Sequence, residues 1–293
     1  MPSFKTSDGS PFPILGERLV VGHCDVSGAG VRACLGLKPG DFDREGAWSR
    51  VAVELTGVPP RRRAIAGEGV GESDDGGGED DDDDDDDAPR GVVFTPGGAR
   101  VADAADADAA DAASAAPMTL TTFDDGVASV LAVNEIVRPG EEAAFAAAVH
   151  DLLTDDATRG NCEGVVVVAA LRMNAPKEGR IFQNVVNGAA PLLIDFQPAE
   201  LPPETKINDP VVAALAHAMT AGGHEMHLIT THGYRVAKLG TKDEKEASEC
   251  ANRVGGAVAA ALECRFRKTG LEATRAWTSD AAAPKEKTDH MYT

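Results

Sequence analysis

The pattern of apolar and polar residues along the chain predicts β-strands that alternate with α-helices. Residues 17–23 (ERLVVGH) have β-branched side chains at their centre and turn residues after them, which is typical of a strand. Residues 47–56 (AWSRVAVELT) alternate between apolar and polar side chains in their second half and predict another strand. Between the two, residues 26–36 are mostly small and include three glycines, which predicts a turn leading into a short helix.

The C-terminal half of the chain carries the clearest strand pattern. Residues 119–122 and 127–137 predict two strands, with residues 124–126 (DDG) as the hairpin turn between them. Residues 164–171 (GVVVVAAL) are continuously apolar, as expected for a strand that is covered on both faces. Residues 225–231 (EMHLITT) predict a further strand.

Two helices are predicted between these strands. Residues 141–153 place Phe145 and Val149 at helical spacing, behind acidic residues that suit a first helical turn. Asp209 followed by Pro210 is the pattern of an N-cap and a proline at the first helical position. The second helix is expected to run to residue 221 and to stop at the two glycines that follow.

A third, longer helix is predicted over residues 243–267. One side of it is formed by Cys250, Val254, Val258, Ala261 and Leu262. Because strands and helices follow one another in turn, parallel crossovers are expected. The sequence therefore predicts an α/β layered fold with a central sheet that is mostly parallel or mixed.

Low-complexity segments interrupt this pattern. Residues 68–87 contain thirteen acidic residues and no Lys or Arg, and they end in eight consecutive aspartates. Residues 102–116 are almost entirely Ala and Asp. Neither segment has a large apolar face to bury, so residues 68–87 are expected to be disordered. Residues 102–116 are expected to be mostly disordered or to form a marginal helix, because alanine has a high helix propensity. Residues 91–95 (GVVFT) between them predict a short strand, which would make the acidic run a loop within the domain.

We therefore expect a single α/β domain over residues 13–275, with a low-complexity insertion at 67–117 and a flexible C-terminal tail at 276–293. The formal net charge is −20, and seventeen of the acidic residues belong to the insertion. The rest of the chain is close to neutral, which excludes a broadly basic surface for nucleic acid.

Membrane insertion and secretion are not expected either. The longest apolar run, residues 165–171, is far shorter than the roughly 20 residues of a spanning helix, and residues 1–12 lack the apolar core of a signal peptide. The five cysteines are scattered and form no CxxC pair, which favours reduced thiols in the cytosol or the nucleus.

One glycine pattern is the basis of an enzymatic alternative. Gly28, Gly30 and Ala33 match the GxGxxA form of the dinucleotide-binding fingerprint. The alternative is a nucleotide-dependent oxidoreductase or transferase that uses the Gly28–Gly30 turn. Four residues separate the pattern from the preceding strand, and the next strand offers no clear acid for a ribose beyond Glu54. A glycine turn in a chain rich in small residues is the simpler interpretation.

Other candidate chemistry is weak. His224, His227 and His232 surround one predicted strand, but alternation and the length of an extended strand keep the three from converging on one zinc ion. No GxSxG elbow or Walker A loop is present, and Ser27 is not an elbow serine. Residues 61–63 (RRR) are too short a basic cluster for a nucleic-acid site. We therefore expect no catalytic residue, no cofactor and no metal.

The end of the chain is more informative. Residues 279–290 are polar, yet the chain ends in Met291, Tyr292 and Thr293. A hydrophobic residue, a tyrosine and a terminal residue form the pattern by which partners dock into pockets on the proteasome α-ring. The terminal carboxylate can pair with a lysine, while the tyrosine ring fills an apolar slot.

The C-terminal half resembles the proteasome assembly chaperones, in particular the first subunit of the heterodimeric chaperone. Three features of residues 118–293 carry the resemblance. They are the helix beginning PVVAALA after IND, the strand at 225–231 followed by a long helix, and the tail ending in Met-Tyr-Thr. The resemblance implies an α/β fold, a second chaperone subunit as partner, a role in α-ring assembly of the core particle, and no catalysis. It also implies that Met291, Tyr292 and Thr293 dock on proteasome α-subunits.

A non-enzymatic assembly chaperone is therefore the expected function, with no nucleic-acid or membrane partner. The nucleotide-dependent enzyme at Gly28 and Gly30 stays open as an alternative. So does a scaffold whose acidic loop attracts basic partners, and such binding should be lost by about 0.5 M salt.

Overall fold

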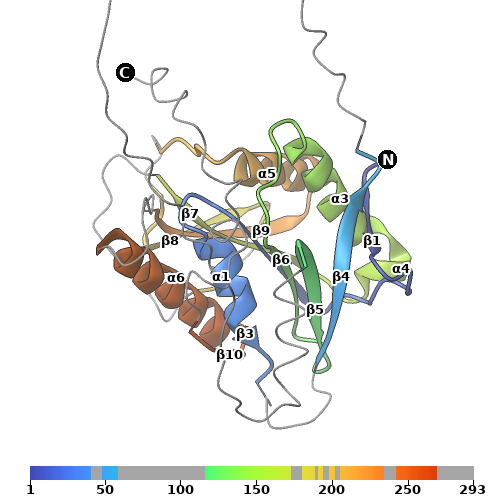
Figure 1. Cartoon of the computed structure of the whole chain (residues 1–293), viewed down its shortest axis with the longest axis horizontal. Helices are drawn as coiled ribbons and strands as arrows, with labels where there is room; N and C mark the ends of the chain where they lie inside the picture. The colour runs from blue at the N-terminus through green and yellow to red at the C-terminus, as the bar shows by residue number, and fades with distance from the viewer. Residues whose placement is uncertain are drawn as a thin grey trace, which may run out of the picture.

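The computed structural model describes residues 1–40, 48–58, 116–172, 180–188, 191–193, 198–201, 205–233 and 242–268. Its centre is an eight-stranded sheet in the order β1-β4-β5-β6-β2-β7-β9-β8 (Figure 1). The strands are β1 (Ser3–Thr6), β2 (Arg18–His23), β4 (Trp48–Thr56), β5 (Met118–Phe123), β6 (Ala128–Val133), β7 (Gly164–Leu171), β8 (Ile181–Val186) and β9 (Glu225–His232).

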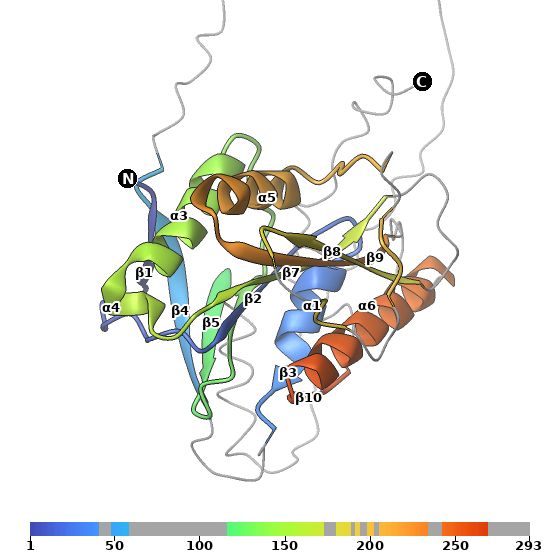
Figure 2. The same cartoon turned by 180° about the vertical axis from the view of Figure 1, so that it is seen from behind.

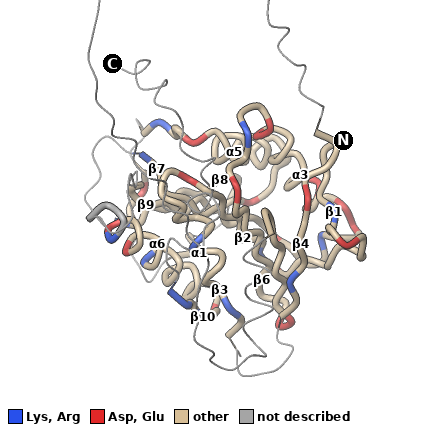
Figure 3. Tube along the Cα trace, viewed as in Figure 1, with Lys and Arg blue, Asp and Glu red and all other residues tan. Residues whose placement is uncertain are grey.

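The sheet is mixed. Its four central strands, β6, β2, β7 and β9, run parallel. The strands on both flanks pair antiparallel, which brings β5, β4 and β1 to one side and β8 to the other. β6 and β7 contain no charged residue (Figure 3), and all eight residues of β7 are buried. This agrees with the predicted layered α/β fold and with a central strand covered on both faces.

Helices cover both faces of the sheet. α3 (Glu142–Thr154) and α5 (Pro210–Gly222) pack on one face, with the short α4 (Asp156–Arg159) beside α3. α1 (Ala29–Gly36) and α6 (Lys242–Ala261) pack on the other (Figure 2). Each face has its own apolar core, and alternate residues of β2, β6, β7 and β9 point into one core or the other. The result is a three-layer αβα arrangement.

Most of the predicted elements are confirmed. The hairpin between β5 and β6 turns at Gly126, whose φ of 73° is the left-handed conformation that glycine adopts readily. Asp209 caps α5, because its side chain accepts a hydrogen bond from the backbone N–H of Val212, and Pro210 occupies the first turn. The helix ends at Gly223, also left-handed.

Two details of the predicted pattern are wrong. β6 ends at Val133, four residues before the predicted strand end. α6 ends at Ala261 instead of residue 267. Beyond it, Glu263 has a φ of 54°, and a two-residue strand, β10 (Arg265–Phe266), pairs with β3 (Leu37–Lys38). The ring of Phe266 lies where side chains at Gly36 and Gly255 would stand, so this turn back toward α1 depends on two glycines.

Two edge strands were not predicted, namely β1 and β8. The predicted strand at 91–95, the acidic and Ala/Asp segments of the 67–117 insertion up to residue 115, and the 276–293 tail lie outside the described residues. None of the helices in the described ranges combines the length and the apolar character needed to cross a bilayer.

Candidate functional site

Polar side chains gather where the central parallel strands end, the place at which open α/β sheets commonly bind ligands. Asp25, two residues after β2, is buried there. Its Oδ1 accepts from the backbone N–H groups of Ser27 (2.9 Å) and Ala29 (3.0 Å). Its Oδ2 accepts from the N–H groups of Gly30 (2.7 Å) and Ala170 (2.8 Å). One carboxylate thus joins the start of α1 to the end of β7.

This arrangement argues against the nucleotide alternative. The free N–H groups at a helix N-terminus are what would bind a pyrophosphate, and at α1 the first of them already bond to Asp25. Both glycines have structural reasons to be glycine. Gly28 has a φ of 64°, and a Cβ on Gly30 would lie 2.3 Å from the carbonyl oxygen of Val168. The fixed negative charge of Asp25 would also repel a phosphate.

We expect nicotinamide and adenine nucleotides at millimolar concentration to shift the Tm by less than about 1 °C. A nucleotide of micromolar affinity would add about 4 kcal/mol of stability at a thousandfold excess, which corresponds to a rise in Tm on the order of 10 °C. Differential scanning fluorimetry measures this shift. The destabilised Asp209→Asn variant serves as the control that the assay responds to stability. A dose-dependent rise with any nucleotide would revive the enzymatic alternative.

A buried ion pair, His23 with Asp209, lies beside Asp25. The Nε2 of His23, the last residue of β2, is 2.9 Å from the Oδ2 of Asp209. The side chains are 3% and 15% exposed. Burial lowers the pKa of His23, but the hydrogen bond to Asp209 and the charges of Asp209 and Asp25 outweigh it, so the pKa lies above 6.5. Burial raises the pKa of Asp209, but the bond to His23 outweighs it, so this pKa lies below 3.8. The pair ties β2 to the first turn of α5.

The three histidines that the sequence singled out do not form a metal site. His227 is buried within β9, where its Nε2 lies 2.6 Å from Glu225 Oε1 and its Nδ1 lies 3.2 Å from Gln183 Nε2. The ring of His224 packs edge-on against His150, with ring centroids 5.0 Å apart. His232 ends the strand at its far side. Within the described ranges, no three metal-ligating side chains come together.

The five cysteines are all free thiols. Burial raises the pKa of Cys34, Cys162 and Cys250, and it raises that of Cys264 to about 12. Because the thiolate is the nucleophile, these four groups are unreactive at neutral pH and act as small apolar side chains.

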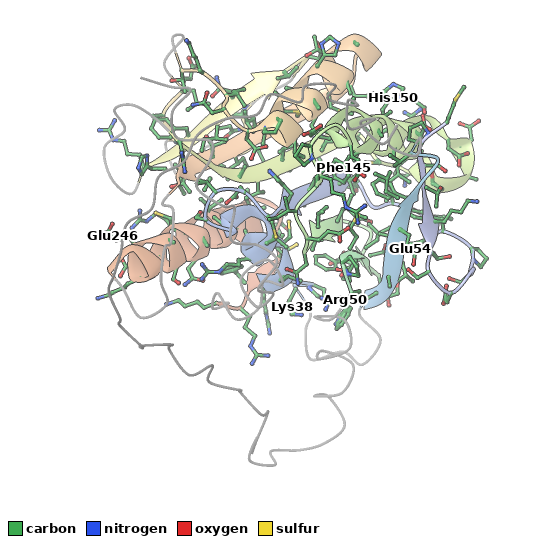
Figure 4. All side chains as sticks on the ribbon, turned by 45° about the horizontal axis from the view of Figure 1, so that its top comes forward. Lys38, Arg50, Glu54, Phe145, His150 and Glu246 are labelled. Atoms are coloured by element: carbon green, nitrogen blue, oxygen red, sulfur yellow. The ribbon has the colours of Figure 1, made fainter. Side chains whose placement is uncertain are left out.

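A hollow with a volume of about 560 Å³ lies between the end of β4 and the start of α3. Most of its lining residues are apolar, among them Leu55, Ile136 and Phe145. Figure 4 labels Phe145 and Glu54, two of the lining residues. Among the described residues that line it, the ionisable ones are three glutamates and Arg138. The hollow therefore offers a concave surface of mixed apolar and acidic character.

The docking residues predicted from the sequence, Met291, Tyr292 and Thr293, lie outside the described residues and stay a prediction. The buried carboxylate Asp25 was missed as a site residue. Its only sequence signal is its place three residues before Gly28, at the turn into a short helix.

No protein-family model matches the chain, and no curated protein matches it. Among solved structures, PbaA of Pyrococcus furiosus, an archaeal homolog of proteasome-assembly chaperone, is 10% identical with a TM-score of 0.48, over 89% of this chain and 86% of PbaA. PbaB of the same organism, an archaeal proteasome activator, is 10% identical with a TM-score of 0.48, over 91% of each chain. A protein of unknown function from Corynebacterium glutamicum is 11% identical with a TM-score of 0.44, over 91% of this chain and 83% of its own. Because all three TM-scores are below 0.5, these similarities transfer no function to this chain.

Proposed function

We propose that this protein is a proteasome assembly chaperone that docks its C-terminus on α-subunits of the core particle and pairs with a second chaperone subunit, in the cytosol or the nucleus. The observation that carries the proposal is the end of the sequence. A polar stretch with one proline ends in Met291, Tyr292 and Thr293.

The chemistry of these three residues suits a socket on another protein. The free carboxylate of Thr293 can form a charge-assisted hydrogen bond with a lysine at the bottom of a pocket. The ring of Tyr292 fills an apolar slot while its hydroxyl finds a polar partner. Met291 packs at the rim, where a flexible thioether adapts to an irregular surface.

The folded body supports a binding role more than a catalytic one. Two acidic groups near the carboxyl ends of the central strands are used internally, since Asp25 holds α1 against β7 and Asp209 pairs with His23. Four of the five thiols have pKa values raised by burial. In this proposal the body presents the tail and binds the second subunit.

Removing the last three residues should abolish capture of proteasome α-subunits. The measurement is a pull-down from a lysate with the full chain and with a chain stopped at His290, followed by quantitative mass spectrometry. The truncated chain loses the contact between its terminal carboxylate and a lysine, and it loses the tyrosine ring. We expect the recovery of α-subunits to fall at least tenfold, since about 1.4 kcal/mol of lost binding free energy already gives that factor.

Two further variants test the mechanism. Thr293→Ser keeps the terminal carboxylate and should bind normally, whereas one extra residue after Thr293 moves the carboxylate and should act like the truncation. Repeating the capture in 0.5 M salt tests the acidic-scaffold alternative, because contacts made only by the acidic run would be lost there. Equal recovery with the full and the truncated chain would remove the tail from the mechanism.

A further inference from the structure

A cluster of cations surrounds Trp48 at the start of β4, and we call Lys38, Trp48, Arg50 and Arg267 the Trp48 cluster. Lys38 Nζ lies 5.1 Å from the centroid of the indole ring, and Arg50 Cζ lies 4.8 Å from it. Figure 4 labels Lys38 and Arg50 close to each other at one end of the molecule. Both distances are within the range of cation–π attraction.

The neighbouring strand β10 adds to the positive charge. Arg265 pairs in register with Lys38, and the backbone N–H of Arg267 donates to the carbonyl of Gly36. Arg265, Arg267 and Lys268 are exposed, and Figure 3 shows Lys and Arg positions around β3 and β10. A short row of cations therefore follows the two-stranded sheet toward Trp48.

These cations repel one another. Burial and, after it, the charges of Arg50 and Arg267 together lower the pKa of Lys38 to about 8. Burial also lowers the pKa of Arg50. Holding like charges together in a half-buried place costs free energy unless an anion compensates them.

Within the described residues, no carboxylate provides that compensation. Other arginines there do have acidic partners, such as Arg18 with Glu163 and Glu225, and Arg138 with Glu141. No ion pair joins Lys38, Arg50 or Arg267 to a described acid. The Nε of Arg50 instead donates to the hydroxyl of Thr121, at 2.9 Å. The cluster is thus a concentration of cations in a chain whose net charge is −20.

We propose that the Trp48 cluster is a binding site for a short acidic segment of a partner protein. Carboxylate side chains would form charge-assisted hydrogen bonds with Arg50 and Arg267 and a point-charge contact with Lys38. A short peptide is favoured over nucleic acid because the site holds only a few cations, too few to follow the phosphates of a long strand. The site lies in the folded body and does not depend on the C-terminal tail.

Trp48 itself reports on the site. The chain has two tryptophans, so a Trp277→Phe background leaves Trp48 as the only indole. The probe is a capped octa-aspartate peptide, with octa-asparagine as the neutral control. We expect a saturable change in Trp48 emission with octa-aspartate only, and a Kd that rises with added salt. Lys38→Gln and Arg50→Gln are each expected to weaken binding about tenfold, as the loss of a charge-assisted contact would.

Matched controls keep the test specific. Arg138→Gln removes one exposed arginine elsewhere and should leave the Kd unchanged. Melting temperatures verify that the variants are folded. Every titration is repeated in a background in which the acids of residues 41–47 and 80–87 are replaced by their amides.

The proposal is overturned if octa-aspartate gives no saturable response in either background, or if Lys38→Gln and Arg50→Gln bind as the parent does. A response only in the amide background would mean that the chain's own acids fill the site, which overturns the assignment to a partner. An equal response to inorganic phosphate at matched concentration would make the cluster a small-anion site and overturn the peptide assignment. Saturable, salt-sensitive binding in both backgrounds supports it.

Discussion

Replacing Asp25 with alanine is expected to lower the free energy of unfolding by about 4 kcal/mol or more. The carboxylate accepts four backbone N–H groups, of Ser27, Ala29, Gly30 and Ala170, and all of them would lose their acceptor in a buried place. Each buried donor left unsatisfied costs about 1–3 kcal/mol. Because whole domains are stable by only about 5–15 kcal/mol, the Asp25→Ala variant should unfold at much lower denaturant concentration.

Chemical denaturation followed by circular dichroism measures this loss. Asp8→Ala is the matched control, since Asp8 also accepts from the N–H group two residues later, that of Ser10, but at an exposed site. Its expected loss is much smaller, because the freed N–H of Ser10 can bond to water. The loss of unfolding free energy for Asp25→Asn should lie between the losses for Asp25→Ala and Asp8→Ala. The amide keeps one acceptor oxygen, but its NH2 group is a donor that faces other donors. A loss under 1 kcal/mol for Asp25→Ala would contradict the structural role of this carboxylate.

The second large effect is expected at Asp209. Asp209→Ala removes both the cap of α5, worth about 1 kcal/mol, and the partner of the buried His23, whose removal costs about 3–5 kcal/mol in typical buried pairs. Asp209→Asn retains an oxygen that can accept from the N–H of Val212, so it isolates the ion pair from the cap. The difference in unfolding free energy between the two variants measures the cap together with any hydrogen bond that the amide keeps to His23.

The stabilisation that the His23–Asp209 pair provides should decrease both at high pH and at low pH. The pKa of His23 is raised above 6.5 in the folded state, so its stabilisation is complete below pH 6.5 and is lost as the pH rises through the folded value. The pKa of Asp209 is lowered below 3.8, so its stabilisation is complete above pH 3.8 and is lost as the pH falls through the folded value.

The stability gap between the parent chain and Asp209→Asn should therefore be widest between pH 3.8 and pH 6.5 and should narrow on both sides. Urea titrations at a series of pH values measure the gap. Asp8→Ala, titrated over the same range, shows how much of the pH dependence belongs to carboxylates in general. A gap that stays constant from pH 3 to pH 9 would contradict a charged pair.

Local signals in the sequence predicted the elements that depend on local physics. The apolar run of β7 predicted a strand buried on both faces, and Asp209 followed by Pro210 predicted a capped helix start. The end of α6 was predicted wrongly because Leu262, Cys264 and Phe266 continue the apolar pattern. The turn there depends on a left-handed Glu263 and on two glycines, Gly36 in α1 and Gly255 within α6, that leave room for the ring of Phe266.

The edge strands and the Asp25 site could not be predicted in this way. β1 is four residues long, and its partner in β4 lies about fifty residues later, so no local pattern marks the pairing. β8 is interrupted by Gln183 and Asn184, whose side chains accept from the N–H groups of Leu193 and Leu201. The bond from Ala170 to Asp25 uses a backbone donor, which every residue but proline has and no sequence reveals.

The central position of β2 has a consequence for synthesis. This strand is almost wholly buried and is made early, but it pairs on one side with β6 and on the other with β7. The amide of Ala170 that completes the bonds of Asp25 emerges 145 residues later. At about 5–20 residues per second, a nascent chain holds this apolar segment unpaired for on the order of ten seconds or more on the ribosome. General chaperones that bind nascent chains should therefore bind this protein at β2. Slower translation should lower the yield of soluble protein.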